Sequence, residues 1–159
     1  MDQQKAGIDV KKKVATGVLS KDSVVVVDPR EAAKIHSRGH VGTPLSGGRL
    51  KLSLVEGLYL LEKGDLQIKN PGSDKTLDFD SMIAYSTKHE ENILQTYQAY
   101  RDLRERGYTP KTGLKYGAHF RVYPKGKGPG EEHAQYLVHV LPENQQLTPR
   151  DLVRLVRLA

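Results

Sequence analysis

Short runs of β-branched residues alternate with capped helical segments along this chain, and that alternation limits the folds it can adopt. Residues 14–19 and 23–27 are two such runs separated by a Lys-Asp pair, which predicts a hairpin or a pair of strands. Asp28 and Pro29 follow as an N-cap and a first helical residue, so a helix is expected to run to about His36. Strands and helices that alternate in this way are typical of a mixed α/β fold.

The segment from residue 37 to residue 80 continues the same alternation. Ser53 and Glu56 have the spacing of a capping box, which predicts a helix that runs to Lys63 and stops at Gly64. The other elements expected here are a loop at 37–48, a short strand at 66–69, a turn at 70–75 and a second helix from 78–80 onward.

Helical spacing of apolar residues begins again at residue 89. Ile93, Tyr97, Tyr100 and Leu103 recur at helical intervals up to Gly107. Strand-like segments and a final helix, capped by Thr148 and Pro149, follow at residues 114–115, 119–123, 135–141 and from 148 onward. We therefore expect an N-terminal α/β domain (1–85) and a C-terminal domain with a mixed sheet (86–159). Because no Gly/Ser/Pro linker marks the boundary, one mixed domain is the alternative.

Composition excludes several classes of protein. The chain has no cysteine, so disulfides, thiolate zinc sites and a cysteine nucleophile are excluded. No run of about 18 apolar residues is present, and the first residues lack the apolar core of a signal peptide. We expect a cytoplasmic protein that does not enter a membrane.

Positive charge is concentrated toward the C-terminal third. The net charge is +6, and residues 109–159 hold eight Lys or Arg against four Asp or Glu. Between Lys111 and Lys127 there are five basic residues and no acidic one; they are Lys111, Lys115, Arg121, Lys125 and Lys127. A basic face is the usual electrostatic signature of a nucleic-acid binder, although a basic pI is also common in other soluble proteins.

Tyr123 and His133 lie on either side of a basic, glycine-rich loop. Alternation along the strand at 119–123 predicts that Phe120 and Val122 face a core, whereas His119, Arg121 and Tyr123 face solvent or a ligand. If this strand pairs with the strand at 135–141 as an antiparallel hairpin, Tyr123 and His133 face one another across its mouth.

A phenol and an imidazole beside basic residues suit the cleavage of RNA through its own 2′-hydroxyl. That reaction needs a base at the 2′-oxygen, an acid at the 5′-oxygen and cations near the phosphorus, and it needs no external nucleophile. Packing and solvation are the plainer interpretations of Tyr123 and His133. His36 and His40 have a metal-ligand spacing, but glycine breaks the helix between them and no carboxylate completes a site. No metal and no cofactor are expected.

The region around these residues resembles the catalytic core of the archaeal tRNA-splicing endonucleases. The residues that carry the resemblance are GLKYGAHFRVYPKG and EEHAQYLVHVL, within residues 113–141. Upstream, residues 52–64 (LSLVEGLYLLEKG) resemble a helix of the family's N-terminal domain. The segment that leads into the family's nuclease fold is similar to YRDLRERGYTPKTGLKYG, residues 100–117. The resemblance implies a small N-terminal α/β domain followed by a restriction-endonuclease-like nuclease domain with a mixed sheet.

The resemblance also implies a reaction. The family cuts precursor tRNA at bulge-helix-bulge junctions without metal and leaves a 2′,3′-cyclic phosphate and a 5′-hydroxyl. Tyr123 matches the family's general base and His133 its general acid. Arg157 matches the arginine that pinches a flipped bulge base, and the candidate RNA-binding residues beside the pair are Arg121, Lys125 and Lys127.

The family's catalytic lysine and its assembly remain open in this sequence. That lysine lies roughly 30 residues after the histidine, beyond Ala159, so either the chain is truncated or a partner completes the site. The resemblance implies an oligomer, either a homotetramer or a heterotetramer with a structural subunit. Only Glu143 is acidic in the turn that corresponds to the family's acidic subunit-contact loop. A catalytic subunit is expected, and the alternative is a non-catalytic subunit that binds RNA or partners.

Overall fold

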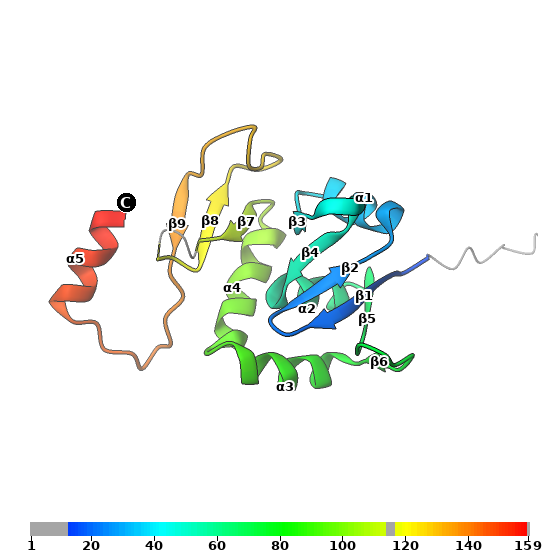
Figure 1. Cartoon of the computed structure of the whole chain (residues 1–159). Helices are drawn as coiled ribbons and strands as arrows, with labels where there is room; N and C mark the ends of the chain where they lie inside the picture. Colours follow the sequence, from blue (N-terminus) through cyan, green and yellow to red (C-terminus); the bar gives the residue numbers. More distant parts are fainter. Residues whose placement is uncertain (1–12, 114–116, 159) are drawn as a thin grey trace, which may run out of the picture.

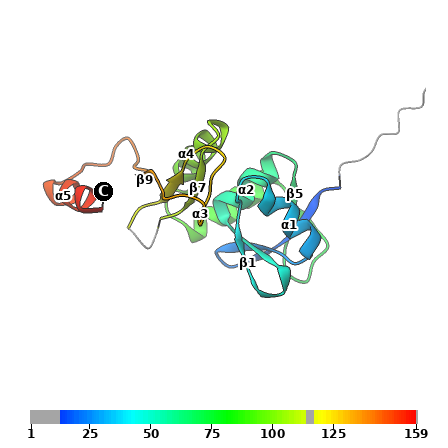
Figure 2. The same ribbon diagram turned by 90° about the horizontal axis from the view of Figure 1, so that it is seen from above.

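Two β-sheets lie on either side of a long helix in this chain (Figure 1). The computed structural model describes residues 13–113 and 117–158, with residues 154–158 described by their backbone alone. The six-stranded sheet comes from the N-terminal half, and a three-stranded sheet comes from the C-terminal half. Seen from above, the C-terminal helix lies beyond the three-stranded sheet, on the side away from the six-stranded sheet (Figure 2).

The six-stranded sheet is mixed and has the strand order β3-β4-β2-β1-β5-β6. β1 pairs with β2 antiparallel and with β5 parallel, in a register that sets Ala15 opposite Leu66. The other neighbours in this sheet pair antiparallel. Its strands are β1 (Ala15–Ser20), β2 (Ser23–Val26), β3 (Thr43–Pro44), β4 (Leu50–Ser53), β5 (Leu66–Lys69) and β6 (Thr76–Leu77). The predicted mixed α/β class is confirmed.

Helices α1 and α2 begin at the residues that their capping signals predict. Asp28 accepts hydrogen bonds from the backbone N–H groups of Arg30 and Glu31, and Ser53 and Glu56 form both bonds of a capping box. Each bond satisfies a donor that has no partner inside the helix. The helices are α1 (Pro29–Ser37), η1 (Ser46–Gly48), α2 (Leu54–Glu62), α3 (Phe79–His89), α4 (Ile93–Glu105) and α5 (Pro149–Leu158).

Several short elements differ from the sequence-based expectation. The predicted loop at 37–48 contains β3 and η1, and β4 and β6 were not predicted. These strands have only two to four residues, too few for a two-residue period to emerge from the sequence. The helix expected from residue 89 begins at Ile93, because α3 ends at His89 and Asn92 adopts a left-handed conformation (φ 57°).

The C-terminal sheet has the order β7-β8-β9, and its described strands pair only antiparallel. Its strands are β7 (Thr109–Thr112), β8 (Phe120–Tyr123) and β9 (Tyr136–Val138). The mixed pairing expected for this sheet is therefore found in the N-terminal sheet instead. The strand predicted at 114–115 lies outside the described residues, and β9 is shorter than the predicted strand at 135–141.

One apolar core reaches from the six-stranded sheet to β8. Tyr100 of α4 is 1% exposed, and its ring centre lies 5.5 Å from that of Tyr59 in α2 and 5.8 Å from that of Phe120 in β8. Aromatic contacts at these distances stabilise packing beyond the area they bury. The domain boundary expected at residue 85 falls within α3. In the described part of the chain, no helix is long and apolar enough to cross a membrane.

Candidate active site

β8 carries Tyr123 at its end, beside Arg121 on the same face of the strand. Phe120 and Val122 are buried in the core, as the alternation predicted. Arg121 Nη1 donates a hydrogen bond to the Tyr123 hydroxyl at 3.0 Å, and its guanidinium carbon lies 5.7 Å from the ring centre. Arg121 Nε also donates to the carbonyl of Thr112 in β7 at 3.0 Å. The tyrosine and the arginine therefore form one hydrogen-bonded pair.

Tyr123 is more buried than the sequence predicted. Alternation placed its side chain toward solvent or a ligand, but it is 5% exposed. Arg121 lies two residues away on the same face and contacts both the ring and the hydroxyl, which reduces the access of water. A strand pattern gives the face of a residue and leaves open what its neighbours cover.

Residues 124–133, which we call loop 124–133, join β8 to the segment before β9. Gly126 (φ 71°) and Gly130 (φ 87°) adopt left-handed conformations that glycine accepts without steric cost. Lys127 N–H donates to the carbonyl of Pro124 at 3.0 Å, which closes a turn at the start of the loop. The ammonium of Lys125 lies 5.6 Å from the ring centre of Tyr108, which precedes β7. The first half of the loop is therefore fixed by a turn and by the contact of Lys125 with Tyr108.

The predicted hairpin is present, with His133 at its mouth. β8 pairs antiparallel with β9 so that Phe120 lies opposite Val138, and Gln135 N–H donates to the carbonyl of Val122 at 2.8 Å. His133 is exposed two residues before Gln135. Among the described residues, no hydrogen bond joins His133 to Tyr123. Both residues therefore lie at the loop end of the hairpin, where loop 124–133 joins its two strands.

The predicted basic patch is smaller than the sequence indicated. Lys125 and Lys127 are exposed on loop 124–133, whereas Lys111 is 8% exposed. Lys115 lies outside the described residues. Arg157 belongs to α5, and its side chain also lies outside the described part of the chain.

Lys111 belongs to a buried polar cluster that sequence reasoning missed. Its Nζ donates to the carbonyls of His40 at 2.7 Å and Gly42 at 2.6 Å, and it lies 3.5 Å from a carboxylate oxygen of Glu56. Burial lowers the pKa of Lys111, and the carboxylate of Glu56 opposes that effect less strongly. Basic residues in one stretch of sequence look alike, and only the tertiary contact with residues 40–42 distinguishes Lys111.

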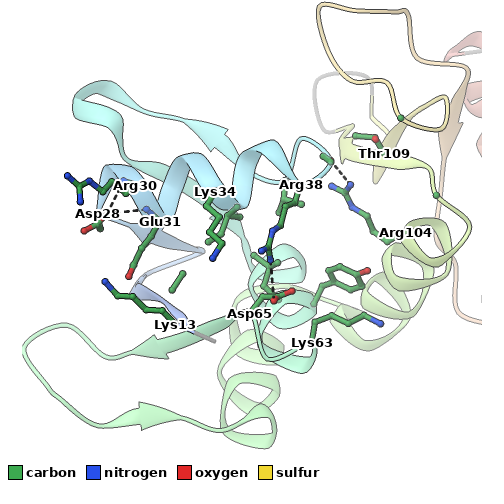
Figure 3. A pocket seen from close by; sticks show the side chains of 18 of the residues that line it. Lys13, Asp28, Arg30, Glu31, Lys34, Arg38, Lys63, Asp65, Arg104 and Thr109 are labelled. Atoms are coloured by element: carbon green, nitrogen blue, oxygen red, sulfur yellow. Dashed lines mark hydrogen bonds and ion pairs between the residues drawn. The ribbon is translucent and has the colours of Figure 1, made fainter. Parts of the chain in front are cut away.

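A cavity of about 590 Å³ lies between α1, the start of β5 and the α4–β7 connection (Figure 3). Arg38 Nη1 lies 3.5 Å from Asp65, and Arg104 Nη1 donates to the carbonyl of Gly39 at 2.6 Å. The charged residues that line the cavity are Lys13, Asp28, Arg30, Glu31, Lys34, Arg38, Lys63, Asp65 and Arg104. Basic side chains outnumber acidic ones in this lining. In the described residues, no group of three or more His, Asp or Glu side chains is placed to hold a metal ion.

His119 precedes β8 and is hydrogen-bonded to the segment that follows β9. The N–H of Val140 donates to Nδ1 of His119 at 3.1 Å, and the ring of His139 lies 6.1 Å away in an edge-on arrangement. Burial lowers the pKa of His119, and proximity to His139 lowers it further. Since Nδ1 accepts a hydrogen bond, this imidazole is held in its neutral form.

Family models match both halves of the chain. A model described as the tRNA intron endonuclease N-terminal domain matches residues 15–83, and the catalytic C-terminal domain of the same family matches residues 93–159. The first match covers the six-stranded sheet, and the second covers α4, the hairpin and α5.

Curated relatives carry the same family name. A tRNA-splicing endonuclease of Thermococcus gammatolerans is 40% identical over 141 residues, which are 89% of this chain and 80% of that protein. One from Sulfurisphaera tokodaii is 36% identical over 153 residues, covering 90% of this chain and 83% of that protein. One from Methanococcoides burtonii is 39% identical over 146 residues, 91% of this chain but 41% of that protein. The chain belongs to the tRNA-splicing endonuclease family.

Proposed function

We propose that this chain is a catalytic subunit of a tRNA-intron endonuclease. It cuts precursor tRNA at bulge-helix-bulge splice sites and leaves a 2′,3′-cyclic phosphate and a 5′-hydroxyl. The observation that carries the proposal is the β8–β9 hairpin, which holds Tyr123 at the end of one strand and His133 at the opposite side of its mouth. Family membership supports the substrate class. We further propose that the chain acts as an oligomer, either a homotetramer or a heterotetramer with a structural subunit.

The proposed reaction transfers one proton from the RNA to Tyr123 and one proton from His133 to the RNA. Tyr123 acts in its phenolate form: its oxygen takes the proton of the 2′-hydroxyl and becomes a phenol, and the freed 2′-oxygen attacks the adjacent phosphorus. The bond from phosphorus to the 5′-oxygen breaks, and His133 gives its proton to that leaving oxygen. Arg121 donates a hydrogen bond to the Tyr123 oxygen, which stabilises its negative charge before the proton arrives and orients the ring. The chemistry consumes no metal, cofactor or external nucleophile.

The basic residues around the pair bind the RNA in this proposal. Lys125 and Lys127 are exposed on loop 124–133 and suit contacts with phosphates, which strengthen binding without reading sequence. Arg157 is proposed to stack on an unpaired bulge base, in keeping with how bulges are generally recognised. Arg121 is assigned mainly to Tyr123, because its guanidinium already contacts that hydroxyl and the carbonyl of Thr112.

The test replaces the proposed acid and compares it with its neighbour. His133→Ala is expected to slow single-turnover cleavage of a bulge-helix-bulge RNA by about 10²–10⁴-fold, the usual contribution of a positioned proton donor. The affinity for that RNA should stay unchanged, since a proton donor acts in the transition state. Glu132→Gln is the matched control, because Glu132 is exposed in the same loop.

The outcome also separates the two candidate roles of the chain. If His133→Ala and Glu132→Gln both cleave at the rate of the unmodified protein, His133 is not the acid. A chain that binds the RNA and still shows no cleavage when it is extended past the position of the family's lysine would instead be the non-catalytic subunit. The burial of Tyr123 (5% exposed) is the observation that favours this second role.

A further inference from the structure

His40 follows α1 in a four-residue segment whose backbone is held at every carbonyl. Arg104 Nη1 donates to the carbonyl of Gly39 at 2.6 Å, and Lys111 Nζ donates to those of His40 and Gly42. The carbonyl of Val41 lies 3.0 Å from Nδ1 of His36. We call this segment, residues 39–42, loop 39–42.

Backbone N–H groups of loop 39–42 are fixed as well. The N–H of Gly42 donates to Glu56 Oε1 at 3.0 Å, and the N–H of His40 donates to the carbonyl of His36 at 3.0 Å. His40 itself has a φ of 58°, which is unusual for a residue other than glycine. Such a conformation persists only where the surroundings determine it. The direction of the His40 side chain is therefore set by its neighbours.

That side chain packs against loop 124–133 at two points. A Cβ atom placed on Gly128 would lie 2.4 Å from Cγ of His40, so only glycine fits against the imidazole. Three residues later, Glu131 Oε1 lies 3.4 Å from His40 Nε2. The N–H of Glu131 also donates to the carbonyl of Gly128 at 3.1 Å, which joins the two points. His133 follows Glu131 by two residues.

We infer that His40 is a positioning residue for His133, which rests on the acid role proposed above. Loop 124–133 contains Gly126, Gly128 and Gly130, and glycine adds conformational freedom that a catalytic loop must lose. Lys125 and Tyr108 hold the first half of the loop, and His40 holds the second half. Through the His40 imidazole, the N-terminal half of the chain therefore contacts the loop that leads to His133.

His40→Ala tests this positioning role in the full-length protein. Single-turnover cleavage of precursor tRNA is expected to fall by about 10²-fold, the effect of misplacing a catalytic group by roughly 1 Å. The affinity for the RNA and the melting temperature should change little. Amide hydrogen exchange of residues 126–133 should become faster. A side chain with only a structural role would lower the melting temperature without separating rate from affinity.

Two variants serve as a conservative rescue and a charge control. His40→Gln keeps an amide donor that can reach Glu131 and much of the side-chain volume, so its rate should lie closer to that of the unmodified protein. Glu131→Gln should slow cleavage, whereas Glu132→Gln should not, because the ion pair described for His40 is with Glu131 and not with Glu132. Equal rates for Glu131→Gln and Glu132→Gln would count against the contact.

Gly128→Ala keeps the inference testable even if His40→Ala folds poorly. With His40 present, the added methyl group meets the imidazole and should displace the loop and slow cleavage. With His40→Ala in the same chain, the methyl group enters the vacated space, so Gly128→Ala should cause no further loss. An equal loss in both backgrounds would overturn the inference.

The inference and the proposed function can fail separately. Unchanged cleavage in His133→Ala would remove the acid role, yet the exchange rates of residues 126–133 in His40→Ala would still report whether His40 anchors the loop. Unchanged exchange in His40→Ala would overturn the anchoring, whatever His133 does.

Discussion

Replacing Lys111 by methionine should strongly destabilise the protein. The two side chains have similar stems, so Lys111→Met removes the ammonium and leaves the packing of the stem nearly intact. Lys111 is 8% exposed and its partner Glu56 is 7% exposed. The substitution leaves Glu56 as a buried carboxylate that keeps two backbone donors, from Gly42 and Ser53, and loses its only cation among the described contacts.

The size of the effect follows from the contacts that are lost. The carbonyls of His40 and Gly42 each lose a donor, and an unsatisfied buried polar group costs about 1–3 kcal/mol. Removing one partner of a buried ion pair typically costs about 3–5 kcal/mol in total. We expect Lys111→Met to lower the free energy of unfolding by that amount. Since domains typically have a free energy of unfolding of about 5–15 kcal/mol, the variant should range from clearly folded to marginally stable.

Urea unfolding measures this loss, with a surface pair as the control. Lys63 Nζ lies 3.7 Å from Glu105, and both side chains are more than two-fifths exposed (41% and 48%). Lys63→Met should therefore lower the free energy of unfolding by no more than about 1 kcal/mol. If Lys111→Met lowers the free energy of unfolding no more than Lys63→Met does, with the urea dependence unchanged, the buried contacts of Lys111 do not stabilise the protein as described.

Two further predictions concern protons and metal. His119 has a lowered pKa in the folded protein, so the folded state binds fewer protons than the unfolded state below the ordinary histidine pKa of about 6.5. The free energy of unfolding should therefore fall as the pH drops from about 6.5 to the lowered pKa of His119. Thermal melts at successive pH values should show a flatter decline for His119→Gln. A decline of the same slope in this variant would show that other groups cause it. Cleavage of a bulge-helix-bulge RNA should proceed in excess EDTA at the rate seen with Mg²⁺, because proton transfer to Tyr123 and from His133 needs no Lewis acid. Activity that vanishes in EDTA and returns with Mg²⁺ would refute the proposed chemistry.

Local signals predicted more of the fold than contacts between distant segments did. Asp28, Ser53 and Glu56 indicate helix starts, because their capping hydrogen bonds join residues no more than three apart. The sequence alone therefore predicts where α1 and α2 begin. β4 is a strand because it pairs with β2; its four residues alternate apolar and polar, but so short an alternation does not distinguish a strand from a loop. The antiparallel hairpin could be predicted because both strands and the loop are adjacent in sequence.

The environment of the candidate site was harder to predict than its residues. Tyr123 and His133 stand out by residue type and spacing, but the burial of Tyr123 depends on the path of the Arg121 side chain. His40 was considered only as a metal ligand, and its contact with Glu131 joins segments far apart in the chain. A short sequence window holds no trace of such a contact.

The parallel pairing of β1 with β5 has a consequence during synthesis on the ribosome. β2 follows β1 at once, whereas the side chain of Gln67 in β5 donates to Thr16 across 51 residues. At a translation rate of about 5–20 residues per second, β1 waits roughly 3–10 s for this second neighbour. During that interval the β1–β2 hairpin presents an unpaired edge, which is a template for pairing with other nascent chains. Translation speed across residues 27–69 should therefore influence how much of the protein is recovered without aggregation.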